Sequence, residues 1–216
     1  MRLAALVVVL VLVGCGEAGP PPPAAATKER ACGPSKVKGK ARSGDVDGDG
    51  RADQVTLRKD RCRHRLVVDR AAGPTVRVKV KPLSWPGTNP RLIKLAEIDG
   101  REGLEPVVSL SPANVYRPGA VYSLRGDSLR RMRRTDARPA DLFPLDDEFP
   151  ADSDCAPEPG TIVVTVGQPA DPDTHWDIER TTYRAQGRRF EPIATERFQA
   201  EVGTEIGGRP FRSCGR

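Results

Sequence analysis

Val76-Arg77-Val78-Lys79-Val80 alternates apolar and basic residues without a break. A period of two sends successive side chains to opposite faces of a strand, so the pattern predicts a β-strand with one buried and one solvated face. Runs of the same character, rich in β-branched residues and bounded by turn residues, cover 54–58, 64–69, 75–81, 91–98, 104–110, 120–125, 128–133, 161–166, 176–184 and 188–198. No stretch has a convincing helical period, so we expect an all-β domain of antiparallel strands.

Turn residues and composition agree with this expectation. Gly126-Asp127 and Gln186-Gly187 lie between neighbouring runs and predict tight hairpin turns. Gly and Pro number 21 each in 216 residues, while 38% of the chain is hydrophobic and 5% is aromatic. This composition excludes a polytopic membrane protein and disfavours a large Leu-rich helical core. We expect short strands, many turns and a small core.

The N-terminal residues have the layout of an export leader. Arg2 precedes an apolar run over residues 3–13, which is shorter than the roughly 20 residues that span a bilayer but suits a secretory signal. The run ends in Leu12-Val13-Gly14-Cys15, which resembles the bacterial lipobox. The resemblance implies a signal peptide over 1–14 and lipid attachment at Cys15, hence an anchor at the extracytoplasmic face of the cell membrane. The alternative is an ordinary signal peptide with an incidental cysteine.

Residues 15–42 form a Pro-, Ala- and Lys-rich stretch typical of a flexible tether, and the β domain follows over 43–216. An even number of further cysteines in an exported chain predicts disulfides. These cysteines are Cys32, Cys62, Cys155 and Cys214. Three connectivities are open, and the pairing 32–62 with 155–214 is favoured because each loop then stays within one half of the chain. The spacings contain no C-x-x-C, which argues against zinc.

The sharpest chemical signal is the acidic segment 45–53, which reads Asp-Val-Asp-Gly-Asp-Gly-Arg-Ala-Asp. Alternate carboxylates converge when the backbone curls, and Gly50 supplies the sharp turn. A hard cation such as Ca²⁺ takes about six to eight oxygen ligands. The candidate ligands are four carboxylates and one main-chain carbonyl, those of Asp45, Asp47, Asp49, Asp53 and Arg51. Thr56 stands where an EF-hand has its bidentate Glu, so the segment is not an EF-hand.

The segment 45–57 resembles the calcium loop of FG-GAP and VCBS-type repeats, the β-propeller blades of integrins and many bacterial surface proteins. The resemblance implies that the loop joins two strands and binds Ca²⁺. The alternative is an acidic turn that binds nothing tightly. A degenerate copy follows over 97–110, with acidic residues at Glu97, Asp99 and Glu105 but Arg101 in place of the third carboxylate. We hypothesise that the Arg101 guanidinium substitutes for the ion there.

The spacing of the two loops suits one propeller blade each, but the domain is too short for the four to eight blades of most closed propellers. We therefore expect blade-like antiparallel meanders in an open arc or in packed sheets. Between 134 and 160 the strand pattern lapses in an acidic, Pro-rich segment, for which we expect an irregular loop. This segment is either a functional loop or one that neutralises the basic strand before it.

No catalytic constellation is present, because the sequence lacks nucleophile and metalloprotease motifs and both His64 and His175 suit structural roles. The net charge of +6 suits an anionic envelope polymer, acidic lipids or an acidic protein as partner, and export argues against nucleic acid. The alternative is that the arginine-rich composition reflects only genomic base composition. We expect a calcium-stabilised binding or structural module at the cell envelope. The alternative is an envelope hydrolase that uses carboxylates of the 134–160 loop.

Overall fold

The computed structural model describes the chain over 40–60, 63–82, 89–110, 118–136, 143–145, 151–171, 174–202, 204 and 210–215. All of these residues belong to one compact unit, Cys32–Arg216. The described residues form strands, turns and bends, with no helix among them. The leader, the tether up to residue 39, Cys15, Cys32 and Cys62 lie outside the described residues.

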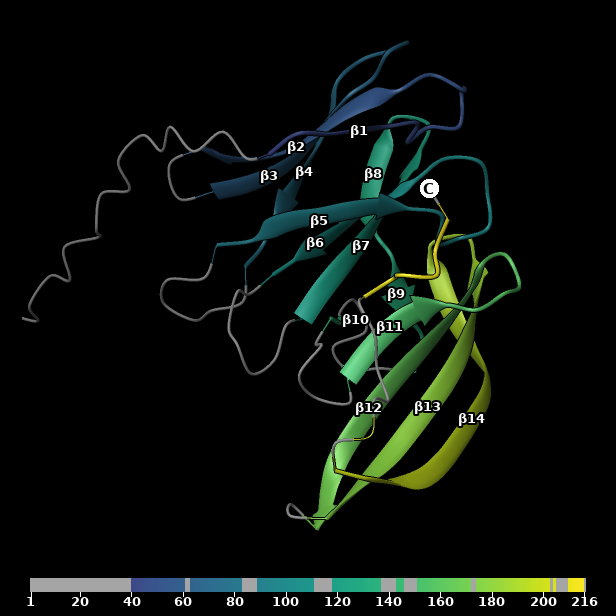
Figure 1. The fold of residues 1–216 in the computed structure, drawn as a ribbon. Coiled ribbons are helices and arrows are strands. Elements are labelled where there is room, and N and C mark those ends of the chain that lie inside the picture. Colours follow the sequence, from purple (N-terminus) through teal and green to yellow (C-terminus); the bar gives the residue numbers. More distant parts are fainter. Residues whose placement is uncertain are drawn as a thin grey trace, which may run out of the picture. The chain divides into compact units, whose positions relative to one another are not determined.

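Three antiparallel meanders of four consecutive strands make up the fold (Figure 1). The first sheet runs in the order β1-β2-β3-β4. Its strands are β1 (Arg42–Gly44), β2 (Asp53–Asp60), β3 (Arg63–Asp69) and β4 (Val76–Val80). The alternating stretch that predicted a strand is β4, with Val76 and Val80 buried and the two basic residues between them exposed.

The second sheet contains β5 (Arg91–Ala96), β6 (Glu105–Ser109), β7 (Pro118–Arg125) and β8 (Ser128–Arg131) in chain order. The short strand β10 (Phe143–Pro144) pairs with the start of β7, so β7 has three strand neighbours along its length. A β-bulge at Ile93 shifts the register between β5 and β6.

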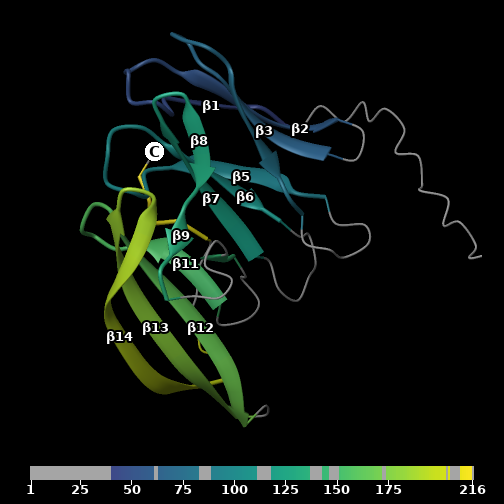
Figure 2. The same ribbon diagram turned by 180° about the vertical axis from the view of Figure 1, so that it is seen from behind.

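The third sheet contains the longest strands, which lie side by side in both views (Figure 2). Its meander is built of β11 (Ala151–Cys155), β12 (Thr161–Asp171), β13 (His175–Gln186) and β14 (Arg189–Glu201). The short strand β9 (Arg133–Arg134) adds to β14 in parallel. None of the three described sheets closes on itself, since each begins and ends on a different strand.

All ten expected strands are present, so the all-β prediction is confirmed. The structure adds β1, β9, β10 and β11, which are short or polar and lack a clear alternation. Two of these lie inside 134–160, where an irregular loop was expected, and Phe143 of β10 is fully buried. The second predicted hairpin turn is one residue later than expected, because Gln186 pairs with Arg189 and leaves Gly187-Arg188 as the turn.

The second sheet supplies both hydrophobic cores, because its strands are buried on both faces. Alternate residues of β7 point to opposite sides: Tyr122 packs with the first sheet and Val121 with the third. The second core centres on three fully buried aromatic rings, with Phe143 at 5.8 Å from Phe190 and 6.3 Å from Phe211 between centroids. Each such ring contributes about 1.5–3 kcal/mol by burial alone.

A disulfide joins Cys155 at the end of β11 to Cys214 near the C-terminus, as the favoured connectivity predicts. It closes a loop with a sequence separation of 59 residues. Phe211 lies inside that loop, and its N–H donates to the Ser153 carbonyl oxygen at 2.7 Å. The bond therefore holds the C-terminal segment against the second core. The predicted partner pair, Cys32 and Cys62, lies outside the described residues.

Candidate metal centre

The acidic segment forms the connection between β1 and β2, which we call the first loop (residues 45–52). Gly48 and Gly50 both have φ of +80°, a left-handed conformation that favours glycine and turns the chain sharply. The turn brings Asp45, Asp47 and Asp49 together, with one carboxylate oxygen of each within 4.8 Å of the others. This aspartate cluster can hold a metal ion.

Backbone N–H groups hold the aspartate cluster in place. Asp45 Oδ1 accepts hydrogen bonds from the N–H groups of Gly48 at 2.7 Å and Asp49 at 3.2 Å, and its Oδ2 accepts the Gly50 N–H at 2.8 Å. Asp49 accepts one from Arg51 at 2.8 Å. These bonds orient the carboxylates, and Asp45 Oδ2 and Asp49 Oδ1, which accept one N–H each, have room for a second partner. The donor set is all oxygen, which suits a hard cation.

Asp53, the last of the candidate metal ligands along the sequence, lies apart from the aspartate cluster. Its side chain is fully buried, and its two oxygens accept the N–H groups of Val46 at 2.9 Å and Ala71 at 2.8 Å. The carboxylate thus ties the start of the first loop to the turn after β3. Asp53 is not among the three residues whose oxygens converge.

The charge around Asp47 is unbalanced. Burial, followed by the charges of Asp53 and Asp49, raises the pKa of Asp47, while Arg70 lowers it. Arg70 Nη1 lies 3.7 Å from the Asp47 carboxylate, and Nη2 of the same guanidinium contacts Asp127 in the β7–β8 turn. One guanidinium therefore offsets only part of the negative charge of the loop, which leaves the aspartate cluster attractive to a cation.

The second loop (residues 97–104) connects β5 to β6 and repeats the backbone design of the first. Glu105 Oε2 accepts the Ile98 N–H at 2.9 Å. Asp53 Oδ2 accepts the N–H of Val46, the equivalent residue of the first loop, in the same way. Asp99 accepts the Arg101 N–H at 3.1 Å, and Gly100 has φ of +73°. The predicted copy therefore shares two hydrogen bonds with the first loop, in which Asp53 accepts the Val46 N–H and Asp47 accepts the Asp49 N–H, and it shares one left-handed glycine.

The hypothesis about Arg101 needs a correction. Arg101 is exposed, and the guanidinium that pairs with Asp99 belongs to Arg125 at the end of β7. Asp99 is almost completely buried and also accepts a hydrogen bond from the Ser123 hydroxyl at 3.3 Å. Burial, followed by the charge of Asp99, raises the pKa of Glu105 to about 8. The Arg125 guanidinium and the raised pKa of Glu105 therefore both reduce the negative charge around Asp99.

An arginine at the end of the third strand of each meander pairs with a loop carboxylate. The three pairs are Arg70–Asp47, Arg125–Asp99 and Arg184–Glu158. The last connects β13 to the third loop (residues 156–160) between β11 and β12. Sequence reasoning missed these arginines, although Arg-Ala-x-Gly occurs at both 70–73 and 184–187.

The three loops also contact one another. The Leu104 N–H donates to the Asp45 carbonyl oxygen at 2.8 Å, and a Cβ on Gly48 would lie 2.9 Å from the Glu102 carbonyl oxygen. Likewise, a Cβ on Gly100 would lie 2.6 Å from the Gly160 backbone nitrogen. The aspartate cluster is therefore part of a continuous packed edge rather than an isolated surface turn.

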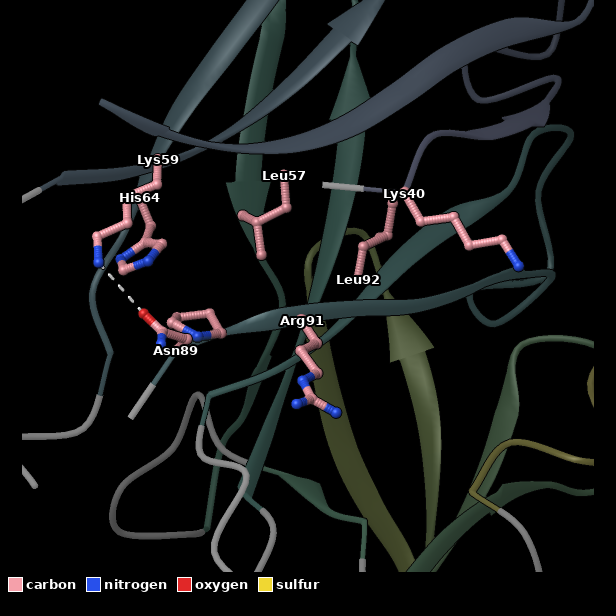
Figure 3. Close-up of a pocket in the computed structure, with 8 residues that line it drawn as sticks. Lys40, Leu57, Lys59, His64, Asn89, Arg91 and Leu92 are labelled. Carbon is pink, nitrogen blue, oxygen red and sulfur yellow. Dashed lines mark hydrogen bonds between the residues drawn. The ribbon is translucent and has the colours of Figure 1, made fainter. Parts of the chain in front are cut away.

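A pocket of about 410 Å³ lies at the opposite end of β2, between the first and second sheets (Figure 3). His64 is 6% exposed, and its Nδ1 is buried without a hydrogen-bond partner. Burial, followed by the charge of Lys59, lowers the pKa of His64. Lys40 and Arg91 point away from Leu57. The described lining of this pocket contains no carboxylate, serine, threonine or cysteine beside His64.

Described acidic residues of the 134–160 segment make contacts that stabilise the fold. Asp154 accepts hydrogen bonds from the Ser213 N–H at 2.7 Å and hydroxyl at 2.8 Å, which fixes the C-terminal segment. Asp141, Asp146, Asp147 and Glu148 lie outside the described residues. His175 is exposed and bonds only to Thr174 among the contacts found.

The described chain contains three antiparallel meanders, and the loop between the first two strands of each carries a carboxylate. Comparisons with family models, with curated proteins and with solved structures each give no match. In the part of the chain that the structure describes, no helix has the length and apolar character required to cross a bilayer.

Proposed function

We propose that this protein is a lipid-anchored binding or structural module on the extracytoplasmic face of the cell membrane, and that Ca²⁺ in the first loop stabilises it. The observation that carries the proposal is the convergence of Asp45, Asp47 and Asp49 within 4.8 Å. The anchor is inferred from the sequence around Cys15.

Calcium is favoured over softer or smaller ions by the kind of donor. Carboxylates, a main-chain carbonyl such as that of Arg51, and water together supply the six to eight oxygens, roughly, that Ca²⁺ takes. Mg²⁺ demands a near-ideal octahedron, whereas a glycine-rich loop adapts its geometry. The neighbouring Arg70 reduces the net charge, which favours the weak affinity of extracellular calcium modules, about 10⁻⁴–10⁻³ M.

A structural role follows from the position of the loop. The first loop packs against Glu102 and Leu104 of the second loop, so an ion in the aspartate cluster stabilises the contact between the two meanders. A ligand that binds only the folded state raises stability by mass action. With Ca²⁺ at ten times its Kd, the gain is about 1.4 kcal/mol, or about 3–6 °C in Tm for a chain of this size.

The test is thermal unfolding of the full chain with Ca²⁺ and with a chelator. We expect a Tm about 3–6 °C higher with Ca²⁺, and we expect Asp49→Asn to abolish the difference. The matched control is Asp177→Asn, which removes an exposed aspartate on β13 and should keep it. The highest Ca²⁺ concentration is about 10⁻² M, tenfold above the Kd of the weakest extracellular sites. A wild-type Tm that does not change up to this concentration would contradict the calcium proposal.

The anchor has a separate test. Cells that express the full chain with radiolabelled palmitate should label the wild type in the membrane fraction. Cys15→Ser should lose the label and leave the membrane, whereas Cys32→Ser should retain both. Label that persists in Cys15→Ser would contradict the anchoring proposal without affecting the calcium proposal.

A further inference from the structure

A groove of about 610 Å³ lies where strands of all three sheets approach one another. Seven of the side chains that line it are cationic, and the eighth is Val78. They come from β4 and the residue after it, from β8 and β9, and from the β13–β14 hairpin. We call this the basic groove, and its cations are Lys79, Lys81, Arg130, Arg131, Arg133, Arg188 and Arg189.

Six of these cations form no ion pair with a carboxylate of the described chain. They are Lys79, Lys81, Arg130, Arg133, Arg188 and Arg189. Elsewhere the described arginines commonly pair with acids, as Arg58 does with Asp69 and Arg180 with Glu196. Like charges within about 10 Å repel one another. The fold therefore concentrates positive charge in the basic groove and leaves it unbalanced.

Neutral contacts hold several of the guanidinium groups in place. Arg188 donates to the Ser128 carbonyl oxygen at 2.7 Å, and Arg130 donates to the Ser128 hydroxyl at 3.0 Å. Arg131 donates to the Tyr122 hydroxyl at 3.0 Å and to the Lys81 carbonyl oxygen at 3.2 Å. Groups that are already oriented lose less entropy when a ligand binds.

Arg188 is the cation that its surroundings satisfy least. Its Nε is buried without a hydrogen-bond partner. Burial, followed by the charges of Arg130 and Arg125, lowers the pKa of Arg188. An anion in the basic groove would relieve the repulsion between Arg188 and the neighbouring arginines. A purely solvated basic face would instead leave its donors in water.

We propose that the basic groove binds a linear polymer that carries oxyanion groups along its length, such as phosphate, sulfate or carboxylate. The assignment rests on the proposed function in one respect, because an extracytoplasmic domain meets polymers of the envelope rather than nucleic acid. The guanidinium fork matches oxyanions in a bidentate manner. Cations from three sheets suit a chain of anionic groups better than a single small anion.

The test uses dextran sulfate as the probe and unsulfated dextran as its neutral counterpart, with the full chain in mild detergent. Lys79→Gln/Arg133→Gln/Arg189→Gln removes three exposed cations, one from the first sheet and two from the third, none of which has a side-chain hydrogen bond in the described chain. The matched control, Arg63→Gln/Arg91→Gln/Arg212→Gln, removes three exposed charges away from the basic groove. Binding is measured across salt concentrations, with and without Ca²⁺.

We expect the wild type and the control triple variant to bind dextran sulfate but not dextran. The groove triple variant should bind at least about tenfold more weakly and lose about two units of the log–log salt slope, because each contact contributes about 0.7 for a flexible polyanion. Equal losses in the two triple variants would overturn the proposal in favour of net charge alone. Binding to anionic phospholipid vesicles but not to dextran sulfate would overturn it in favour of a membrane surface.

A measurement on the wild type covers the case in which the groove variant fails to fold. Phenylglyoxal modifies accessible arginines, and dextran sulfate should protect Arg133 and Arg189 but not Arg91 and Arg212. Equal protection of both pairs would overturn the proposal. If dextran sulfate does not bind but Ca²⁺ still raises the Tm, the groove proposal is wrong and the calcium proposal stands. If dextran sulfate binds in the groove but Ca²⁺ has no effect on the Tm, the calcium proposal is wrong and the groove proposal stands.

Discussion

Replacement of Glu105 by Gln tests the electrostatics of the second loop. Glu105 is 4% exposed, and its Oε2 accepts the Ile98 N–H at 2.9 Å. Burial, followed by the charge of Asp99, raises the pKa of Glu105 from 4.5 to about 8. A hydrogen bond between the Glu105 and Asp99 carboxyl groups, which requires a proton, acts in the same direction. Arg125 faces the pair from β7 through its contact with Asp99.

The sign of the effect follows from the raised pKa of Glu105. The folded chain binds more protons than the unfolded chain between pH 4.5 and about 8, so this contribution is fully present below pH 4.5 and is lost as the pH rises toward 8. One pKa unit corresponds to about 1.4 kcal/mol. Between about pH 5.5 and 7.5 the free energy of unfolding should therefore fall by about 2–3 kcal/mol from this group, or by about 5–10 °C in Tm.

The assay is urea unfolding at both pH values at fixed Ca²⁺. Gln keeps the acceptor for Ile98 and carries its N–H at every pH, so Glu105→Gln should gain about 2–3 kcal/mol relative to the wild type on going to the higher pH. Glu158→Gln removes an exposed glutamate from the third loop and should keep the wild-type pH dependence. A wild type and a Glu105→Gln variant with equal pH dependence would refute the reasoning.

Two further outcomes test the packing. Replacing Cys155 and Cys214 together by Ala should lower the free energy of unfolding, measured with urea, by about 4 kcal/mol, because this is the loop-entropy value for a closure of this length. A loss below about 1 kcal/mol would show that the C-terminal segment is held in place without the disulfide. Gly50→Ala should cost only the left-handed strain of about 1–2 kcal/mol, since no atom lies within 4 Å of the new Cβ. Gly48→Ala should cost more in the same assay because its Cβ meets the Glu102 backbone, and equal costs would contradict that contact.

Period-two alternation was enough to predict the long strands but not the short ones. The run at 76–80 alternates because one face of β4 is solvated, so its sequence carries the signal. β7 is buried on both faces and was still recognisable by its apolar run. β10 has two residues, and β11 reads Ala-Asp-Ser-Asp-Cys, so neither carries a pattern. Their positions are set by tertiary contacts, above all the burial of Phe143 and the disulfide at Cys155.

The sequence predicted the members of the first loop better than their roles. Spacing alone indicates that Asp45, Asp47 and Asp49 can converge, because the glycines between them permit the turn. Spacing does not show that the Asp53 oxygens accept backbone N–H groups, since Ala71, one of the donors, is 18 positions away. The same limit explains the error over Arg101. A neighbour in sequence was chosen for Asp99, whereas the folded chain brings Arg125 from the third strand.

Each of the three loops is stabilised in a different way. This difference explains why we propose an ion only in the first loop. In the first, the aspartate cluster leaves negative charge that a single arginine does not balance. In the second, Arg125 pairs with the buried Asp99 and the pKa of Glu105 is raised to about 8, so these two carboxyl groups attract a cation less strongly. In the third, the disulfide at Cys155 fixes the end of β11, and the exposed Glu158 contributes about 1 kcal/mol or less. Calcium is therefore expected to act on the first meander and its contact with the second, and removal of the ion should loosen that edge first.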